Sequence, residues 1–391
     1  MKSLSEGSVG PLLLVSRNFP PLQGGMEKLN QHLLEELSKS YRTALIGPVG
    51  SSEYALHADT VKECRSALMP FLVGATLKAI LWARVNKPAV IMAGSGVNGI
   101  SAYLGAKLSG ARWGAYLHGL DIIVNSAAYR WAFLRVLKKA DFWIVNSRAT
   151  RDAAIEAGFD ASRIYLLNPG VAVSERLPSK ELVQQWLVDN HLQGKKVLLS
   201  VGRLMKRKGL AEFISRSLPD IVRACPNTVL VVIGEEPRSA LLKSGTCRAE
   251  LVDMAQMAGV ESNVRLMGSV SDDNLQLAYA AADAHVFPVL DLPGDMEGFG
   301  MVSIEAASAG TPTVAFSAGG VPDAVRCGIS GQLIRPGDYV NFTEAVVSIL
   351  KKKVTYDPEA LTRFSREFSW SSFGARLRDI TPLRREDGSK P

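Results

Sequence analysis

The segment Asp295-Met-Glu-Gly-Phe-Gly-Met-Val-Ser-Ile-Glu305 places two carboxylates, Glu297 and Glu305, eight positions apart around a glycine-rich turn. The mostly apolar residues after the turn end at Gly310, with Pro312 just beyond, which is a typical helix end. Glu305 is therefore predicted to lie in a short helix among apolar neighbours. An unpaired buried carboxylate is costly or changes its pKa, so Glu305 needs hydrogen-bonding partners, which a sugar diol would supply.

Glu297 lies directly before the turn Gly298-Phe299-Gly300. Free backbone amides and the positive end of the helix dipole meet at such a turn, and glycines let a ligand approach the main chain. These properties suit a diphosphate. The structural alternative is that Glu297 is a solvated loop residue and Glu305 a salt-bridged core residue, because structural ion pairs also perturb carboxylates.

A basic loop upstream favours the ligand-binding interpretation. The apolar run Val197–Val201 is predicted to be a buried strand, and Gly202-Arg203-Leu-Met-Lys206-Arg207-Lys208-Gly209 follows it. Open α/β sheets bind ligands at the carboxyl ends of their strands. Arg203 and Lys208 would neutralise a departing diphosphate, the first through bidentate contacts and the second as a compact charge. The alternative is an ordinary solvated basic loop.

Short apolar runs alternate with helical patterns along the whole chain, which is typical of parallel sheets with helices on both faces. We therefore predict two Rossmann-like α/β domains, over residues 1–188 and 189–363, with a linker between Leu177 and Gly194. The predicted strands are Leu12–Ser16, Thr43–Ile46, Ala89–Ala93, Trp113–Leu117, Phe142–Val145, Ile164–Leu167, Val197–Val201, Val229–Ile233, Val264–Met267, Ala284–Phe287, Thr313–Phe316 and Gln332–Ile334. Residues 384–391 form a polar tail that we expect to be disordered.

Four motifs of this chain resemble those of the retaining glycosyltransferases of family 4, which have the two-domain GT-B fold. They are the glutamate pair Glu297 and Glu305 with its Gly-Phe-Gly insert, the basic pair Arg203 and Lys208, the loop Gly24-Gly25, and the element His118-Gly119. The resemblance implies an acceptor-binding N-terminal domain and a donor-binding C-terminal domain that face a central cleft. It also implies that a last helix, over about 364–383, crosses back to the first domain.

The resemblance further implies a role for each matching residue. The second glutamate holds the nucleotide ribose, the first contacts the donor sugar, and the basic pair binds the diphosphate. The predicted catalytic residues are Glu297, Arg203, Lys208 and His118, and the predicted donor-binding residues are Gly24, Gly25, Gly202, Val270, Gly298, Phe299, Gly300 and Glu305. Asp121 is expected to bind the acceptor or to orient His118.

Two of these assignments have plain structural alternatives. Gly24-Gly25 would turn two backbone amides toward the donor diphosphate, but a simple strand-to-helix turn also needs glycine. His118 follows the predicted strand Trp113–Leu117 and would contact the donor sugar, although a hydrogen-bonded core histidine has the same sequence signature.

A second glycine motif points to another class of protein. Gly94-Ser-Gly96-Val-Asn-Gly99 follows a predicted strand, and Asp121 lies further along the chain, as in dinucleotide-binding folds. A lone motif of this kind is weak, and the acidic residue lies in a loop rather than at the tip of the second strand. We interpret these glycines as tight turns or as a wall of the acceptor site, and expect no nicotinamide cofactor.

Composition and charge narrow the possible partners. The net charge is +7, and residues 1–190 hold 21 Lys/Arg against 15 Asp/Glu. Ala67–Arg84 and Tyr129–Lys139 mix apolar bulk with cations and would suit an anionic membrane surface, or they could be ordinary helices that cover a sheet. No aromatic residues are interleaved with a basic groove, so nucleic acid is not expected as a partner.

Other features bear on compartment and cofactors. The cysteines Cys64, Cys225, Cys247 and Cys327 are widely spaced without a CxxC pair, which indicates neither a zinc site nor a disulfide framework. Leu12–Val15 resembles a first strand more than a signal peptide, and no uncharged apolar run is long enough to span a membrane. We expect a cytoplasmic protein, peripheral on the inner face of the membrane. The sequence has no DxD motif, so a nucleotide diphosphate sugar is expected without a metal.

The resemblance implies transfer of a hexose from a nucleotide diphosphate sugar to a hydroxyl of a lipid-linked or saccharide acceptor. The segment Asp295-Met-Glu-Gly-Phe-Gly300 is more similar to family members that use GDP-mannose-type donors than to those that use UDP sugars, so a mannose-type sugar is expected. Retention of configuration is expected by same-face attack or through a covalent intermediate. Such a step would serve cell-envelope polysaccharide, lipopolysaccharide or glycolipid biosynthesis. The alternatives are an epimerase or phosphorylase of the same architecture, and a non-catalytic nucleotide-sugar-binding protein.

Overall fold

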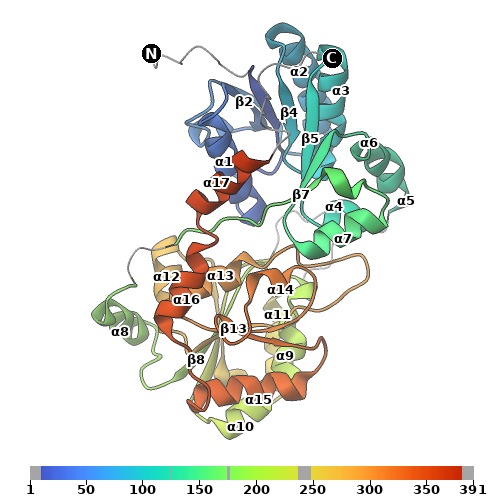
Figure 1. Ribbon diagram of the computed structural model, residues 1–391. Coiled ribbons are helices and arrows are strands. Elements are labelled where there is room, and N and C mark those ends of the chain that lie inside the picture. Colours follow the sequence, from blue (N-terminus) through green and yellow to red (C-terminus); the bar gives the residue numbers. More distant parts are fainter. Residues whose placement is uncertain (1–9, 125, 174–176, 237–247, 381–391) are drawn as a thin grey trace. The chain divides into compact units, whose positions relative to one another are not determined.

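The computed structural model describes residues 10–124, 126–173, 177–236 and 248–380. The chain forms two compact units, and each is built around its own parallel sheet (Figure 1). The first unit extends to Gly170 and includes the chain again from Trp370, whereas the second extends from Val171 to Ser369. The predicted α/β class with two Rossmann-like parallel sheets is confirmed.

The first unit has a seven-stranded sheet in the order β3-β2-β1-β4-β5-β6-β7, and every neighbouring pair is parallel. Its strands are β1 (Leu12–Val15), β2 (Thr43–Pro48), β3 (Thr60–Cys64), β4 (Val90–Ala93), β5 (Arg112–Leu117), β6 (Phe142–Val145) and β7 (Ile164–Leu166). In β1, Leu13 and Val15 pack on one face of the sheet and Leu12 and Leu14 on the other. A strand buried on both faces reads as a continuous apolar run, which explains its sequence.

Helices cover both faces of this sheet. The helices of the first unit are α1 (Gly25–Ser38), α2 (Leu68–Asn86), α3 (Gly99–Ser109), α4 (Leu120–Ile123), α5 (Ala127–Tyr129), a π-helical turn (Arg130–Leu134), α6 (Arg135–Leu137), α7 (Arg148–Glu156) and α17 (Trp370–Asp379). The core on one face includes Phe71 of α2 and Ala102 of α3, and the core on the other includes Leu33 of α1 and Phe373 of α17.

The edge strand β3 was not among the predicted strands. It pairs only with β2, at the end of the sheet, and most of its residues are partly exposed. Lys62 and Glu63 therefore stand in a strand that needs no continuous apolar run. The sequence signal of a buried parallel strand is absent for this reason.

The second unit has a six-stranded parallel sheet in the order β10-β9-β8-β11-β12-β13. Its strands are β8 (Lys196–Val201), β9 (Thr228–Ile233), β10 (Val264–Gly268), β11 (Ala284–Phe287), β12 (Thr313–Phe316) and β13 (Gly331–Ile334). Its helices are α8 (Lys180–Asp189), α9 (Leu210–Arg216), α10 (Leu218–Ala224), α11 (Arg248–Met257), α12 (Asp272–Ala281), α13 (Met301–Ser308), α14 (Val321–Ala324), α15 (Tyr339–Leu350) and α16 (Pro358–Arg366). Leu198 of β8 packs on one face of the sheet, and Val197 and Leu199 pack on the other.

The division between the units lies earlier in the chain than the expected boundary after residue 188. Helix α8 belongs to the second unit, because Trp186 is buried in the same cluster as Leu199 of β8. At the other end, α16 belongs to the second unit and α17 to the first, so the chain passes between them at Ser369. Residues 384–391, for which we predicted a disordered tail, lie outside the described residues.

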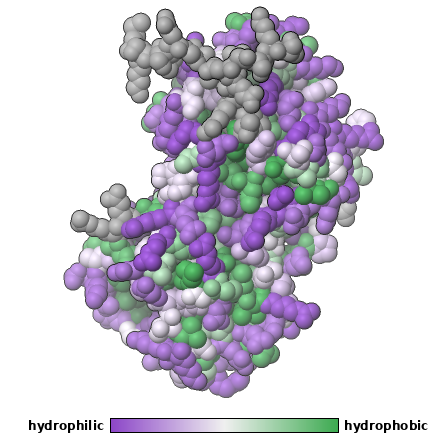
Figure 2. All heavy atoms as spheres, in the orientation of Figure 1, coloured by the Kyte–Doolittle hydropathy of each residue, from purple (hydrophilic) through white to green (hydrophobic). Residues whose placement is uncertain are grey.

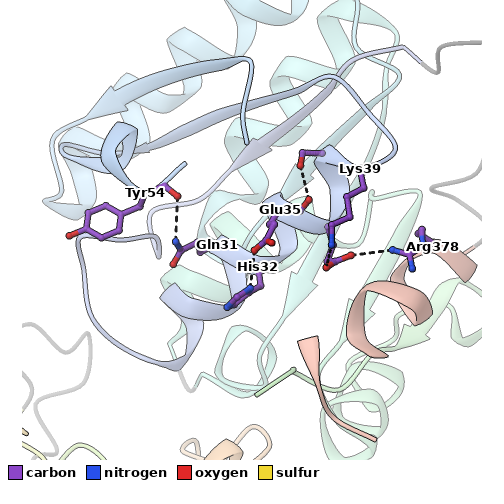
Figure 3. A network of polar contacts seen from close by, with 8 residues as sticks. Gln31, His32, Glu35, Lys39, Tyr54 and Arg378 are labelled. Atoms are coloured by element: carbon purple, nitrogen blue, oxygen red, sulfur yellow. Dashed lines mark hydrogen bonds and ion pairs between the residues drawn. The ribbon is translucent and has the colours of Figure 1, made fainter. Parts of the chain in front are cut away.

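A buried glutamate fastens α17 to α1. Glu36 of α1 is 5% exposed, and its carboxylate accepts hydrogen bonds from Lys39 at 2.6 Å and from Arg378 of α17 at 3.1 Å (Figure 3). Gly374 faces this carboxylate so closely that an added Cβ would lie 1.9 Å from Glu36 Oε2. The last helix therefore needs glycine at the point where it crosses α1.

Among the described residues, α2 is the one helix that is long and apolar enough to cross a membrane by length and composition, and 28% of its most apolar window is buried. Cys64, Cys225 and Cys327 are free thiols, and Cys247 lies outside the described residues.

Candidate active site

Two neighbouring strands of the second sheet bring the basic loop and the glutamate turn together. β8 leads into the loop that holds Lys208, and β11, which pairs with β8 in parallel, leads into the segment before α13. Parallel neighbours end at the same edge of a sheet, so side chains about ninety positions apart in sequence come into contact. Glycine permits the approach: Gly209 has a φ of +66°, and a Cβ there would lie 2.0 Å from the carbonyl oxygen of Pro288.

Lys208, Arg207 and Glu297 form a buried ion cluster at this edge. Lys208 Nζ lies 2.8 Å and Arg207 Nε 3.3 Å from Glu297 Oε2, and the three side chains are 11–13% exposed. Both cations donate to the same carboxylate oxygen. Glu297 is thus neither solvated nor isolated, which excludes the solvated-loop alternative for this residue.

The electrostatics of the cluster keep Glu297 ionised. Burial by itself raises the pKa of Glu297, but the charges of Lys208 and Arg207 outweigh it and hold this pKa at about 2. Burial lowers the pKa of Lys208 from its ordinary value, and the attraction of Glu297 opposes that shift. An anionic ligand that approached Lys208 would therefore compete with Glu297 for a cation held in a largely dry setting.

Two aromatic rings pack next to Lys208. Its Nζ lies 4.6 Å from the centre of the Phe287 ring, and His285 stacks on Phe287 with ring centroids 5.7 Å apart. His285 is fully buried, and burial, assisted by the charge of Lys208, lowers its pKa to about 3. The imidazole of His285 is therefore neutral and adds no positive charge next to Lys208.

Arg207 and Asp295 were not singled out as site residues by the sequence reasoning. Arg207 Nη1 lies 3.6 Å from Asp295 Oδ1, and burial raises the pKa of Asp295 despite this cation. Arg203, the predicted partner of Lys208, has an exposed side chain whose charge helps to lower the pKa of Lys208, and it stays a predicted diphosphate contact. The sequence signal for Arg207 is only its place in the basic loop, and loop geometry decides which of the loop cations turns inward.

Glu305 lies in α13 and is held by a tyrosine. The Tyr279 hydroxyl, on α12, donates a hydrogen bond of 3.0 Å to Glu305 Oε2, and Tyr279 is 3% exposed. Glu305 itself is half-buried, and its neighbours Ile304 and Ala306 are buried, so the predicted short helix with apolar neighbours is confirmed. No sequence pattern links Tyr279 to Glu305, because the contact joins two different helices.

Backbone and aromatic contacts hold the turn Gly298-Phe299-Gly300 in place. The amide of Gly320 donates to the carbonyl of Glu297 at 2.8 Å, and Gly300, at a φ of +98°, precedes α13. Phe299, a predicted donor-binding residue, is 2% exposed and packs against Phe368 with ring centroids 5.6 Å apart. Its side chain anchors the turn in the core of the second unit, so only its backbone, with that of Gly298, remains for a ligand.

Gly202 follows β8 and Val270 follows β10, and both of these strands pair with β9. Gly202 has a φ of +137°, and its α-carbon lies beside the Lys208 side chain, which would be 3.5 Å from an added Cβ. Val270 is partly buried and packs on the core next to β9 and β10. The structure leaves both as predicted donor-binding positions.

In the first unit, Gly24 and Gly25 form the turn before and at the start of α1. Gly24 has a φ of +153°, and an added Cβ would lie 2.4 Å from Glu27 Oε2. Glu27 is buried and accepts a hydrogen bond of 2.8 Å from Asn18 Nδ2. Glycine at position 24 is thus required by backbone conformation and by the glutamate folded against it.

Asp121 contacts the backbone of His118 and not its imidazole ring. His118 Nε2 is 3.0 Å from the carbonyl oxygen of Gly94, and the ring stacks on Tyr116. Asp121 accepts from the backbone amides of His118, at 2.9 Å, and Gly96, at 3.0 Å. It therefore holds the main chain of His118 rather than orienting its imidazole.

The same contacts explain the Gly94–Gly99 motif. A Cβ at Gly94 would collide with Asn30 and Ser16, and one at Gly96 would collide with Asp121. The acidic residue of the apparent fingerprint is thus bonded to the motif's own backbone. Among the described residues, no group of three or more His, Cys, Asp or Glu side chains is placed to hold a metal ion.

Comparisons with known proteins match both halves of the chain. Residues 23–175 match the family described as Glycosyltransferase Family 4, and residues 186–367 match the one described as Glycosyl transferases group 1. A GDP-mannose-dependent alpha-(1-6)-phosphatidylinositol monomannoside mannosyltransferase of Mycolicibacterium smegmatis is 26% identical over 96% of this chain and 99% of its own length. A D-inositol 3-phosphate glycosyltransferase of the same organism is 30% identical over 61% of this chain and 51% of its own length.

Solved structures show the same architecture. Anabaena HepE, solved in complex with UDP-glucose, superimposes with a TM-score of 0.76 at 19% identity and covers 95% of this chain and 99% of its own. The apo form of the lipopolysaccharide outer core galactosyltransferase WaaB gives a TM-score of 0.69 at 16% identity over the same shares of the two chains. At such identities the likeness concerns the fold.

Proposed function

The chain belongs to glycosyltransferase family 4 and has the GT-B fold, and from this premise we propose that it transfers mannose from GDP-mannose to a hydroxyl group of a lipid-linked or saccharide acceptor. The anomeric configuration of the sugar is retained. The second unit binds the nucleotide sugar and the first unit binds the acceptor.

The observation that carries this proposal is the buried cluster of Lys208, Arg207 and Glu297 beside the helix that bears Glu305. Departure of a nucleoside diphosphate concentrates negative charge on the leaving oxygen. Preorganised cations in a dry site stabilise such charge without reorganisation, which is often the largest catalytic contribution. Lys208 and Arg207 supply these cations, and Glu305, oriented by Tyr279, binds the ribose hydroxyls.

The pairing of Glu297 favours same-face attack over a covalent intermediate. Two cations hydrogen-bond to Glu297 Oε2, and their positive charge lowers the nucleophilicity of the whole carboxylate. In the same-face mechanism the acceptor oxygen bonds to the anomeric carbon, the bond to the diphosphate breaks, and the leaving phosphate oxygen takes the acceptor proton. Glu297 then orients Lys208 and Arg207 toward the diphosphate and contacts the sugar.

The relatives support the choice of donor and acceptor. The mannosyltransferase of M. smegmatis, which matches nearly end to end, is named for GDP-mannose and for a phosphatidylinositol mannoside. HepE, the structural neighbour, is solved with UDP-glucose, so UDP sugars are the alternative donors to be tested. A lipid-linked acceptor places the enzyme at the inner face of the cytoplasmic membrane, in cell-envelope polysaccharide or glycolipid assembly.

The first experiment is a thermal-shift series with GDP, UDP, ADP, their sugar conjugates and NAD, because a ligand that binds the folded state raises the melting temperature by mass action. We expect the largest shift with GDP-mannose or GDP. Transfer from the selected donor to phosphatidylinositol mannosides and to soluble mannosides then tests the reaction. A donor that binds without transfer would indicate a nucleotide-sugar-binding protein, conversion of the donor without acceptor an epimerase, and a shift with NAD alone would refute the proposal.

A further inference from the structure

Three helical segments on one side of the first unit combine an exposed apolar stripe with a complete lack of carboxylates. This face consists of α2, α3 and the segment Ala127–Lys139, which includes α5, the π-helical turn and α6. Helix α7, which carries Asp152 and Glu156, packs on the same core cluster and lies outside this face. All three segments contribute to the same core cluster, through residues such as Phe71, Ala102 and Leu137, and α2 packs along α3 (Figure 1). Their outer sides therefore belong to one side of the sheet.

The stripe runs along the whole of α2. Its members, spaced four residues apart, are Met69 (66% exposed), Val73 (59%), Leu77 (58%), Leu81 (64%) and Val85 (81%). A spacing of four places side chains in a line on one side of a helix. The opposite side of α2 is fully buried and carries residues two positions along from the stripe, namely Phe71, Ala75, Ala79 and Ala83.

Such a helix is unusual for a surface element. Helices that cover a sheet normally present polar side chains outward, and hydrophilic side chains dominate the surface in Figure 2. Contiguous exposed apolar side chains mark an interaction surface. The buried side of α2 is part of the core, so this helix can lie on a bilayer but cannot cross one without dismantling the unit.

The charge of the face is of one sign. α2, α3 and residues 127–139 contain no Asp or Glu. The cations of the face are Lys78, Arg84, Lys107, Arg130, Arg135, Lys138 and Lys139. On the same side of the sheet, α7 carries the exposed Asp152 and Glu156, so the lack of carboxylates is confined to these three segments.

An exposed tryptophan lies among these cations. Trp131 is 68% exposed and follows Arg130, and it lines a surface hollow with Arg135 and Lys138. Tryptophan is enriched at the boundary between lipid and water, where its ring is apolar and its N–H reaches polar groups.

From these observations we propose that this face docks to an anionic lipid surface, with the α2 stripe buried at the boundary of head groups and acyl chains and the cations bound to lipid phosphates. Apolar burial and electrostatic attraction then act together, as in other helices that lie in the interface. A second copy of the chain is a poor occupant, because a symmetric contact would bring two carboxylate-free cationic faces together without a counter-charge. The proposal adds a partner to the proposed function, since a lipid-linked acceptor lies in such a surface, but vesicle binding does not require catalysis.

The test uses the full chain and flotation with vesicles of phosphatidylcholine alone or with 30% phosphatidylglycerol, about one anionic lipid in three, which gives a surface potential of physiological order. We expect binding to the anionic vesicles that weakens with salt. Leu77→Asp with Leu81→Asp should lower the partition coefficient by about tenfold or more, because two apolar side chains are replaced by charges that anionic lipid repels. Met257→Asp, at a position on α11 that is 79% exposed, is the matched control and should bind as the unchanged chain does.

Two further variants and two readouts separate the outcomes. Arg130→Glu with Lys138→Glu should abolish the preference for anionic vesicles while leaving the melting temperature unchanged. Transfer to a soluble acceptor should be the same in all variants, so a failure of the catalytic proposal would be seen separately from a failure of docking. No binding of the unchanged chain, equal binding of the double Leu variant, or a dimer in sedimentation that the Leu variant dissolves would each overturn the proposal.

Discussion

Lys208 Nζ lies 2.8 Å from Glu297 Oε2, with the two side chains 12% and 13% exposed. A charge pair so enclosed is only moderately stabilising as a pair, but removal of one member leaves an uncompensated buried charge. We therefore expect a charged ligand of the second unit to bind at this pair.

Replacement of Lys208 by alanine should weaken donor binding and slow transfer, because the cation acts on the bound diphosphate and on the leaving diphosphate. We expect kcat to fall by about 10²–10³-fold, the range seen for loss of one electrostatic donor. Initial rates over a range of donor concentrations measure both effects. Lys206→Ala, at an exposed position in the same loop, is the control. Unchanged kinetics in Lys208→Ala would show that Lys208 does not belong to the site.

The pKa of Glu297 predicts how stability depends on pH. It is held at about 2, below the ordinary value of 4.5, so the folded state favours the ionised form. This contribution is fully present above about pH 4.5 and is lost as the pH falls toward 2. In denaturant titrations between pH 6 and about 2.5, the unchanged chain should lose more stability than Glu297→Gln. Parallel curves for the two proteins would contradict the low pKa.

Tyr279→Phe should weaken nucleotide binding and leave kcat nearly unchanged. The variant removes the hydroxyl that donates to Glu305 Oε2 and keeps the ring in place. A hydrogen bond to a charged group is worth about 1.5–3 kcal/mol, so Kd for the nucleotide should rise by about 10–100-fold. Calorimetric titration with the nucleoside diphosphate measures it. Tyr339→Phe is the control, and a fall in kcat without a change in Kd would refute a positioning role.

Gly374→Ala should destabilise the protein although alanine is the better helix former. The substitution normally stabilises a helix by about 0.5–1 kcal/mol. Here the new Cβ would lie 1.9 Å from Glu36 Oε2 and push the carboxylate away from Arg378. We expect a net loss of about 1–3 kcal/mol in urea unfolding, the usual cost of overpacking.

A second substitution at Glu36 separates this clash from a loss of glycine flexibility. In Glu36→Ala the carboxylate is absent, so adding Gly374→Ala to that variant should cost nothing or should stabilise it. Equal destabilisation in both backgrounds would show that the two residues do not interact.

The apolar strands could be predicted from the sequence because their signal is local. Leu12–Val15 and Val197–Val201 are continuous apolar runs, and burial on both faces of a sheet requires such runs wherever they lie in the chain. The edge strand Thr60–Cys64 was not predicted, because it pairs with a neighbour along one edge only and most of its residues are partly exposed. Such a strand does not need a continuous apolar run.

The candidate site was only partly predictable. Glu297, Glu305 and Lys208 could be named from motif spacing, and the structure places Lys208 in contact with Glu297. Arg207, Asp295 and Tyr279 could not be named, because each acts through a contact between distant segments. Asp121 was predicted to bind the acceptor or to orient the imidazole of His118. It bonds to backbone amides rather than to that imidazole, and acceptor binding stays a prediction.

The α/β class, the family resemblance and the polar residues available to the site could all be predicted from the sequence, since these depend on composition, period and spacing within short segments. Which cation of the basic loop meets Glu297 depends on the fold, because two parallel strands whose carboxyl ends coincide bring Arg207 and Glu297, ninety positions apart, within 3.3 Å. The fold also decided that the apolar residues of α2 divide into a buried and an exposed line, since that depends on which side of the helix the sheet covers.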